Sequence, residues 1–466
     1  MPRRAGPSRI ELHSQACGGL STADVRSLSG VSRRGQKLEA ADAVRLVRAR
    51  DTVMTGLAGG QTPGLLEALG TRTDLEQVSL YGALFMRPYA LLEHPAIRVQ
   101  SGFFGPAERV VRAQGATIEY MPVDFHGTER LLLRSKPRVI FAATTPPDRE
   151  GWLNFGIHAG ATDRVLRAAL TDPERLVVCE ANPHMPWIEG MESFGRNRVH
   201  VSQIDAWVEH PVELLSLPAI PATPEETAIA RHVEGLIEDG ATLQFGIGGV
   251  PDEVATLLAN GTRRGFGIHT EMFSDGAMRL HLADKVANRK GLYDGVSVAT
   301  FAFGSAELYR WLDHHPLVRM LPVSATNEPA QLRQLTRFVS INGALIVDSR
   351  GQVAADYVAG RQYSGIGGHE SFVMGASEAP GGRSIVCLKS TATVNGQRIS
   401  TIVPRLPEAA TVTTPRHHVQ WIVTEHGAVD LSPLGDRSRA RALIEIAHPD
   451  FRLDLQRTLE EESRHG

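Results

Sequence analysis

Cysteine is scarce in this chain. Only three of its 466 residues are cysteines, Cys17, Cys179 and Cys387, and no two of them form a Cys-x-x-Cys pair. Widely spaced single cysteines argue against a disulfide-rich scaffold and against a zinc ribbon. Low cysteine use is typical of proteins in a reducing compartment, so the sequence predicts a cytoplasmic location.

The chain also lacks a dominant charge sign and any long apolar run. Its net charge of −3 at pH 7 argues against a nucleic-acid-binding surface. No apolar run approaches the length that a membrane-spanning helix needs, and the N-terminus lacks the apolar stretch of a secretory signal. We therefore expect no nucleic-acid partner and no membrane segment. Residues 1–35 are expected to form a flexible tail, with a transit peptide as the alternative.

Several catalytic motifs are absent as well. The sequence contains no His-Glu-x-x-His, no Gly-x-Ser-x-Gly and no P-loop. The histidine pairs at 314–315 and 417–418 are adjacent, so their side chains point in different directions on a regular element. They are more typical of surface or core histidines than of metal ligands, and we expect no metal site.

Helical and strand-like patterns alternate along the chain. Its length exceeds what one hydrophobic core usually supports, which predicts at least two domains. The alternation predicts mostly parallel sheets with helices on both faces. Three prolines within Leu217–Pro224 are typical of an extended linker. We therefore predict two open α/β domains, at residues 36–218 and 225–466.

The same order of elements occurs twice. Residues 38–69 read as helix, strand, glycine turn, proline and helix, and residues 226–258 repeat that order. Further on, Val99–Gly105 resembles Ile268–Ser274. The repeats favour an ancient duplication that produced two related domains. The alternative is that βα units resemble one another for physical reasons alone.

A dense polar cluster surrounds Glu271. The segment 267–276 reads GIHTEMFSDG, and it follows a strand at the edge where ligands bind in parallel sheets. When the repeats are aligned, Glu271 faces Gly102, so only the second half carries a carboxylate there. This asymmetry predicts a specific task for Glu271, against the alternative of an ordinary surface glutamate. His269 is a candidate for substrate contact or for packing, and Asp275 for a hydrogen bond to the loop.

The first of two glycine-rich turns contains Gly246, Gly248 and Gly249. Glycines let backbone N–H groups approach a ligand, and the N-terminus of a following helix favours negative charge. The turn is therefore a candidate site for a phosphate or an oxyanion, although it can also be purely structural. A dinucleotide site is disfavoured, because Pro251 stands where the third glycine of that motif belongs.

The second glycine-rich turn contains Gly365, Gly367 and Gly368, and it follows an apolar, strand-like run. Two such turns that converge beside Glu271 would form an oxyanion hole next to a nucleophile. The alternative is again a purely structural turn.

Several motifs together resemble those of a known family. The segments 246–251, 267–276, 423–427 and 446–451 are similar to signatures of the acetyl-CoA hydrolase/transferase family, within the class I CoA-transferases of the 4-hydroxybutyrate/acetate type. The resemblance runs from about Leu38 to about Leu455. Because it comprises several long motifs in the right order, it is far more specific than one glycine turn.

The resemblance implies a fold and a function. It implies a CoA-transferase with acyl-CoA and a small carboxylic acid as substrates, no permanently bound cofactor, and an active site in the second domain of a homodimer. The matched site residues are the catalytic Glu271, the CoA-binding Gly246, Gly248 and Gly249, Asn342 near CoA, and Gly365 and Gly367 in a loop that stabilises the thioester oxygen.

One stretch departs from the family pattern. After Gly368 the family usually has glutamine, a variable residue, aspartate and phenylalanine, whereas this chain reads His369-Glu370-Ser371-Phe372. The departure leaves the acyl and acceptor preference open, and it makes His369 a candidate substrate contact.

The expected chemistry starts from an ionised glutamate. Attack on a thioester gives a mixed anhydride, which the released thiolate converts into a glutamyl-CoA thioester. Lys389 and Arg398 are candidate partners of the CoA phosphates, or else ordinary surface charges. Two other functions stay open: an acyl-CoA hydrolase that uses the same glutamate, and a non-catalytic CoA-binding protein.

Overall fold

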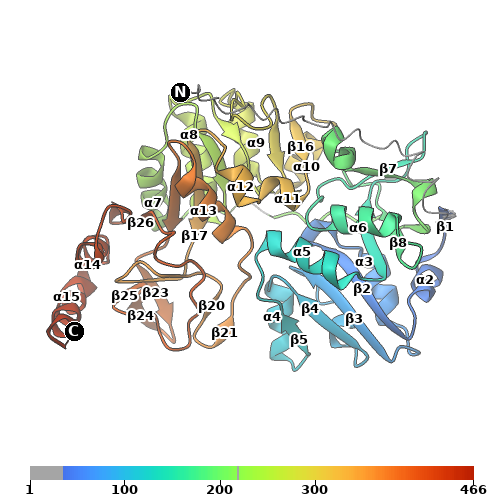
Figure 1. The fold of residues 1–466 in the computed structure, drawn as a ribbon, viewed down its shortest axis with the longest axis horizontal. Helices are drawn as coiled ribbons and strands as arrows, with labels where there is room; N and C mark the ends of the chain where they lie inside the picture. The colour runs from blue at the N-terminus through green and yellow to red at the C-terminus, as the bar shows by residue number, and fades with distance from the viewer. Residues whose placement is uncertain (1–34, 218–219, 466) are drawn as a thin grey trace, which may run out of the picture.

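The computed structural model describes residues 35–217 and 220–465, and it contains two halves that each surround a mostly parallel sheet (Figure 1). The predicted tail, except for residue 35, and Cys17 lie outside the described residues. Two related open α/β halves confirm the fold class that the alternation predicted. Within the described residues, no helix combines the length and the apolar character needed to cross a bilayer.

The first sheet has eight strands in the order β1-β10-β8-β6-β2-β3-β4-β5, and all neighbours are parallel. The strands are β1 (Gln36–Lys37), β2 (Arg50–Leu57), β3 (Gln77–Ala83), β4 (Ile97–Ser101), β5 (Ile118–Tyr120), β6 (Val139–Thr144), β8 (Leu176–Ala181) and β10 (Ala206–Glu209). The helices are α2 (Ala40–Ala43), α3 (Pro63–Gly70), α4 (Pro106–Ala113), α5 (Phe125–Ser135) and α6 (Thr162–Leu170). Every residue of β6 is buried, as expected for a central strand covered on both faces.

The second sheet has the order β12-β11-β17-β22-β26-β27, and only the β26–β27 pair is antiparallel. Its strands are β11 (Thr242–Phe245), β12 (Gly267–Ile268), β17 (Phe338–Gly343), β22 (Arg383–Cys387), β26 (Trp421–Thr424) and β27 (Gly427–Asp430). Its helices are α7 (Pro224–Gly235), α8 (Gly249–Asn260), α9 (Asp275–Leu282), α10 (Ala306–Leu312), α11 (Val323–Thr326), α12 (Pro329–Leu332) and α13 (His369–Glu378).

Helix α7 begins directly after the proline-rich linker because its first turn is well capped. The Thr223 hydroxyl accepts a hydrogen bond from the Glu226 N–H at 3.3 Å, and the Glu226 carboxylate accepts one from the Thr223 N–H at 2.8 Å. Pro224 occupies the first helical position, where its missing N–H costs nothing. The capping box therefore fixes where the second half starts.

The two halves share one topology. Beyond β12, a bridge between His269 and Val298 leads to β14 (Ser297–Ala299), which pairs with β16 (Val318–Met320). The order β26-β22-β17-β11-β12-β14-β16 therefore matches β10-β8-β6-β2-β3-β4-β5, with connecting helices in corresponding places. This agreement supports the duplication that the repeats favoured.

The topology also corrects the alignment of Glu271 with Gly102. Strand β12, which precedes Glu271, takes the place of β3, whereas Gly102 follows β4, the counterpart of β14. The sequence alignment was therefore wrong by one βα unit. The physical reason is that strand ends in parallel sheets share small, polar sequences, so short similarities do not fix the register.

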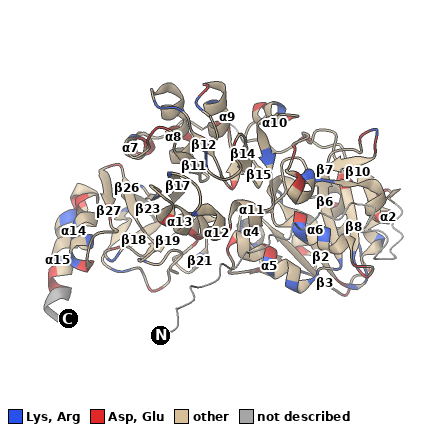
Figure 2. Ribbon diagram, turned by 45° about the horizontal axis from the view of Figure 1, so that its top comes forward, with Lys and Arg blue, Asp and Glu red and all other residues tan. Residues whose placement is uncertain are grey.

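The end of the chain adds small sheets and two helices to the second half. These elements are β18 (Ile346–Asp348), β19 (Val353–Ala354), β20 (Tyr357–Val358), β21 (Arg361–Gln362), β23 (Thr391–Val394), β24 (Gln397–Ser400), β25 (Ile402–Val403), α14 (Asp436–Glu445) and α15 (Pro449–His465). Figure 1 shows α14 and α15 at the end of the molecule away from the first sheet. Figure 2 shows that basic and acidic residues are interspersed along them, with no block of one sign.

The two halves interlock where their sheets approach. The strand β7 (Trp152–Asn154) pairs with β9 (Arg198–His200), and the loop after β7 reaches the second half. There the Ala302 N–H donates to the Ile157 carbonyl at 2.8 Å, and the Ala159 N–H donates to the Thr300 carbonyl at 3.0 Å. Backbone hydrogen bonds of this kind fix the two halves relative to each other, which matters because the candidate site lies between them.

Candidate active site

Glu271 lies between β12 and β13 (Met272–Phe273), at the carboxyl end of the second sheet. Its backbone carbonyl accepts hydrogen bonds from the Thr300 N–H at 3.0 Å and the Phe301 N–H at 3.1 Å. Strand β13 then pairs with β15 (Phe301–Ala302). Hydrogen bonds to residues 300 and 301 and the pairing of the next strand thus fix the main chain of Glu271, which leaves its side-chain carboxylate as the reactive group.

The Glu271 carboxylate has two hydrogen-bond donors. The Asn327 side-chain amide donates to its Oε2 at 2.6 Å, and the backbone N–H of Gly368 also donates to the carboxylate. The Asn327 Oδ1 in turn accepts from the Thr326 hydroxyl at 2.8 Å, which orients the amide. Amide donors fixed in this way on a carboxylate are the arrangement that stabilises an oxyanion when the carboxylate reacts.

Burial raises the pKa of Glu271 to about 7. The hydrogen bond from Asn327 and the one from Gly368 oppose this rise, whereas the negative charge of Asp124 in the first half adds to it. Near neutral pH the carboxylate is therefore close to its midpoint of titration. Such a group is both ionised in part and more basic than an ordinary glutamate, which suits a nucleophile.

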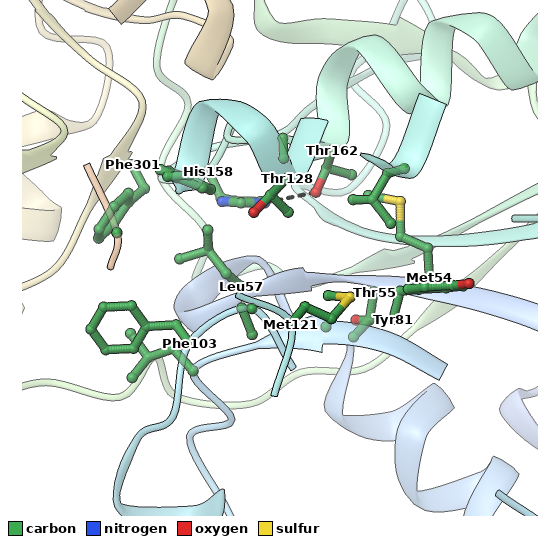
Figure 3. A pocket seen from close by; sticks show the side chains of 18 of the residues that line it. Met54, Thr55, Leu57, Tyr81, Phe103, Met121, Thr128, His158, Thr162 and Phe301 are labelled. Carbon is green, nitrogen blue, oxygen red and sulfur yellow. Dashed lines mark hydrogen bonds between the residues drawn. The ribbon is translucent and has the colours of Figure 1, made fainter. Parts of the chain in front are cut away.

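A cavity opens beside the carboxylate and extends into the first half (Figure 3). It holds about 700 Å³ of empty space, including its open mouth. Its walls are mostly apolar. The lining residues are Met54, Thr55, Leu57, Tyr81, Gly82, Ala83, Leu84, Gly102, Phe103, Met121, Phe125, Thr128, Leu132, His158, Ala161, Thr162, Ile247, Glu271, Phe301 and Gly367. Glu271 thus belongs to the second half, but most of the wall belongs to the first.

The glycine turn at 365–368 joins the two halves at this cavity. A side chain at Gly365 would lie 2.7 Å from the Gly102 carbonyl oxygen and 2.8 Å from Phe103, so only glycine allows this approach. The Gly367 carbonyl accepts a hydrogen bond at 2.9 Å from the Phe125 N–H, at the start of α5. The turn reaches Glu271, where Gly368 supplies a backbone donor.

The other glycine turn lies near the same cavity. The half-exposed side chain of Ile247, between Gly246 and Gly248, lines the cavity. Gly248 has a φ of 131°, which side chains rarely adopt, and it precedes α8. The two turns therefore lie near one cavity, as the sequence indicated.

Lys389 lies close to the turn at 246–249. Its Nζ forms an ion pair of 3.1 Å with Glu226, and a Cβ at Gly249 would lie 2.8 Å from the carboxyl carbon of Glu226. A cation thus stands beside the N-terminus of α8, where negative charge is favoured.

This chain is similar over most of its length to known proteins. Residues 304–459 match the model of the acetyl-CoA hydrolase/transferase C-terminal domain. The chain is 35% identical to succinyl-CoA:cyclohexane-1-carboxylate CoA transferase from Geobacter metallireducens, over 89% of this chain and 92% of that protein. The chain belongs to the acetyl-CoA hydrolase/transferase family.

Within the family, CoA-transferases match this chain at higher identity than acetyl-CoA hydrolases do. The chain is 38% identical to 4-hydroxybutyrate coenzyme A transferase from Clostridium kluyveri, over 72% of this chain and 76% of that protein. The crystal structure of RipA from Yersinia pestis has a TM-score of 0.84 and 33% identity, over 94% of this chain and 99% of that one. Acetyl-CoA hydrolases match at only 23–26% identity. These findings confirm the predicted CoA-transferase enzyme.

Asn342, which the family pattern places near CoA, lies at the end of β17. Its amide pairs reciprocally with that of Gln244, at 3.1 and 3.2 Å. Its Cα and Oδ1 would each lie 3.5 Å from a Cβ at Gly246. Asn342 therefore packs against Gly246 in the first glycine turn, from the strand β17 that pairs with β11.

Two candidate histidines are buried. The ring of His269 lies between Tyr293 and Phe338, and its Nε2 is 2.9 Å from the Thr326 carbonyl. Burial lowers the pKa of His269 to about 3, so the ring is neutral. His369 begins α13, and burial lowers its pKa to about 4. Neither histidine lines the cavity.

Asp275 and Arg398 have other partners. Asp275 accepts a hydrogen bond at 2.9 Å from the Ser305 N–H, so it supports the start of α10. Arg398 lies on the exposed strand β24 and forms an ion pair with Asp450. In the part of the chain that the structure describes, no group of three or more histidine, cysteine or acidic side chains could hold a metal ion.

The sequence reasoning missed three important residues. Asn327, on the end of α11, holds the Glu271 carboxylate, and Asp124 acts on the pKa of Glu271 from the first half. His158 lines the cavity, and its Nε2 lies 2.9 Å from the Thr162 hydroxyl. None belongs to a recognisable motif, although Asn327 follows a Ser-Ala-Thr stretch that is polar and small.

Proposed function

We propose that this family member transfers CoA through a covalent adduct on Glu271. One observation carries the proposal: the Glu271 carboxylate lines the cavity while the Asn327 amide and the Gly368 N–H donate to it. A carboxylate with its own oxyanion donors, beside an apolar cavity, is suited to acyl transfer.

In the first step, a carboxylate oxygen of Glu271 attacks the thioester carbonyl carbon of the acyl-CoA. The carbon–sulfur bond breaks, the CoA thiolate leaves with the electron pair, and an acyl-glutamyl anhydride forms. A thioester is an activated donor, so the carboxylate needs no separate general base. Its raised pKa increases its basicity and hence its nucleophilic strength.

In the second step, the thiolate attacks the glutamyl carbonyl carbon. The bond to the acyl oxygen breaks, the first carboxylic acid leaves, and a glutamyl-CoA thioester forms. Negative charge develops on the glutamyl oxygen, and Asn327 and Gly368 both donate to this carboxyl group. An acceptor carboxylate then reverses both steps and leaves as the new acyl-CoA.

The CoA moiety is assigned to the side of the cavity marked by the turn at 246–249. Gly246, Gly248 and Gly249 offer backbone amides, and Lys389 offers a cation beside them. Remote binding energy of this kind helps to position the thioester for attack. Asn342 supports the turn, and His269 packs behind the Glu271 loop. Phosphate contact by Arg398 and substrate contact by His369 stay predictions.

Assembly and location also belong to the proposal. A homodimer in the cytoplasm is what the family resemblance and the low cysteine content predict. Cys179 and Cys387 are buried and free, and burial raises the pKa of both thiols to about 12. Both thiols are therefore protonated and unreactive, as a reduced protein requires.

The adduct can be tested by trapping. The protein is incubated with acetyl-CoA without an acceptor and treated with borohydride or hydroxylamine, and its peptides are analysed by mass spectrometry. We expect modification of the peptide that contains Glu271, and none in Glu271→Gln. Glu307→Gln, at an exposed glutamate of α10, is the matched control and should be labelled like the native chain. An active protein without modified Glu271 would refute the proposal.

Transfer and hydrolysis are separated by the same reagents. We expect release of free CoA from acetyl-CoA to be slow on its own and transfer to dominate when a carboxylic acid is added. Acceptor-independent release at the full rate would instead assign the chain to the hydrolases.

A further inference from the structure

The part of the cavity that lies in the first half offers space for the group that a substrate acid carries. Figure 3 shows the wall running from Phe103 and Phe301 toward Met54 and Tyr81, away from the second half. Because CoA is assigned to the opposite side, the remainder of the acyl group would enter this space. The inference therefore rests on the proposed function.

Charge is almost absent from this wall. Among the described residues that line the cavity there is no lysine and no arginine, and Glu271 is the sole acidic residue. His158 does not supply a positive charge, since burial lowers its pKa to about 4. The Nε2 of His158 and the Thr162 hydroxyl already pair at 2.9 Å, and the Thr128 hydroxyl donates to the Asp124 carbonyl at 3.0 Å.

A second carboxylate on the acid would therefore be buried without a cation. Burying an unpaired charge is strongly unfavourable, and here it would also face the negative charge of Glu271. The side chains Leu57, Phe125 and Leu132 instead offer apolar surface, and Met54 and Met121 are flexible enough to adapt to different shapes. Each methylene that is buried there improves binding roughly fourfold.

We infer that the acid exchanged at this site is an apolar monocarboxylate with a hydrocarbon group larger than acetate, and that dicarboxylates are rejected. The hydrocarbon lies in the first half between β2, β3 and α5, while its carboxyl group meets Glu271. The specificity of the enzyme therefore resides in the half that does not carry the nucleophile.

One glycine gives a direct way to narrow the cavity. A Cβ at Gly102 would lie 3.5 Å from the Thr128 hydroxyl, 3.8 Å from the Met121 methyl and 3.9 Å from the Ala83 Cβ, which are ordinary contacts. The Cβ of Gly102→Val therefore fits beside its neighbours, and its two methyl groups take up space that a hydrocarbon chain would use. Gly235→Ala, on α7 with nothing within 4 Å of the new Cβ, is the matched control.

The experiment uses the full chain with acetyl-CoA as donor and measures kcat/KM for butanoate, hexanoate, cyclohexanecarboxylate and succinate. We expect hexanoate to exceed butanoate by about sixteenfold, because two further methylenes are buried at roughly fourfold each. Succinate should fall below butanoate by about a hundredfold or more, because its second charge is unpaired. In Gly102→Val the ratio of hexanoate to butanoate should fall by about tenfold, and in Gly235→Ala it should not change.

The outcomes separate the two proposals. If succinate is used as well as hexanoate, or if Gly102→Val leaves the ratio of the two monocarboxylates unchanged, the inference is wrong while the transferase mechanism stands. If the folded protein transfers CoA neither to any of these acids nor to acetate labelled with carbon-13, the proposed function fails, and the inference fails with it.

Discussion

Two loops at equivalent places in the duplicated fold face the same cavity with different chemistry. Residues 365–368 precede α13 in the second half, and residues 156–160 precede α6 in the first. The second-half loop places the Gly368 N–H on the Glu271 carboxylate. The first-half loop instead carries His158, a buried neutral ring paired with Thr162. On the proposed mechanism, one loop supports charge development and the other shapes the space for a hydrocarbon.

The largest expected effect comes from adding a methyl group to the second-half loop. Gly368 has a φ of −88°, which suits alanine, but the new Cβ of Gly368→Ala would overlap the Glu271 carboxylate. We expect kcat to fall on the order of 10²–10³-fold or more, with the fold intact. Steady-state kinetics and a thermal melt measure the two effects.

The matched change in the first-half loop is Gly160→Ala. Gly160 has a φ of 49°, and its Cβ would meet the His158 ring, so stability should fall before catalysis does. If Gly160→Ala reduced kcat as much as Gly368→Ala at equal folded fraction, the proposed division between the loops would be wrong.

The next effect concerns the amide that holds the nucleophile. Asn327→Ala removes the donor that lies 2.6 Å from the Glu271 Oε2, and we expect kcat to fall on the order of 10²-fold. Asn342→Ala is a useful comparison, because its amide pairs with Gln244 and not with Glu271. That variant should lose about 1 kcal/mol of stability and little turnover. Equal losses of turnover in both variants would contradict the role of Asn327.

The pH dependence distinguishes the two halves by their titrating groups. The pKa of Glu271 is about 7, and the carboxylate must be ionised to attack. We expect kcat/KM for acetyl-CoA to rise about tenfold per pH unit below pH 7 and to level off above it. His158, with a pKa of about 4, is neutral over this range and should add no inflection. An inflection near the ordinary value of a glutamate would contradict the burial of Glu271.

The smallest effect is on stability. The folded-state pKa of Glu271 is raised from 4.5 to about 7, so ionisation of this group favours the unfolded state. That destabilisation is fully present above pH 7 and disappears as the pH falls toward 4.5. We expect Glu271→Gln to be more stable than the native chain by about 1–2 kcal/mol at high pH. Urea unfolding at about pH 8 and about pH 5 measures it, and a difference independent of pH would contradict the shift.

The sequence pointed to Glu271 as the candidate nucleophile because its surroundings are unusual in composition. Glu271 stands in a polar, glycine-bounded segment after a strand, and parallel sheets bring such segments to the ligand-binding edge. The glycine turns were recognisable for a similar reason, since close backbone approach requires glycine at Gly365 and a φ of 131° favours glycine at Gly248. The alternation of strands and helices likewise sufficed to predict two parallel α/β halves.

The sequence did not indicate the partners that reach Glu271 from elsewhere. Asn327 is 56 residues away, directly after a four-residue helix, and its role depends on the path of the chain between them. The cavity wall was also hidden, because Met54 and Leu57 on β2 have the same character as any core residue. His269 belongs to the most conspicuous segment, yet its ring turns into the core, since the β12 extension pairs with β14 at that position.

The hydrogen bond from Phe125 to the Gly367 carbonyl has a consequence for engineering. On the proposed assignment, substrate choice and bond-making chemistry reside in different halves of the chain, so a chimera could combine the first half of one homologue with the second half of another. The contacts across the seam of such a hybrid include the backbone hydrogen bonds of Ile157 and Ala159, the glycine opposite Gly102, and the Phe125 N–H at the first turn of α5. A chimera that preserves these contacts alters the range of accepted acids while the residues around Glu271 stay unchanged.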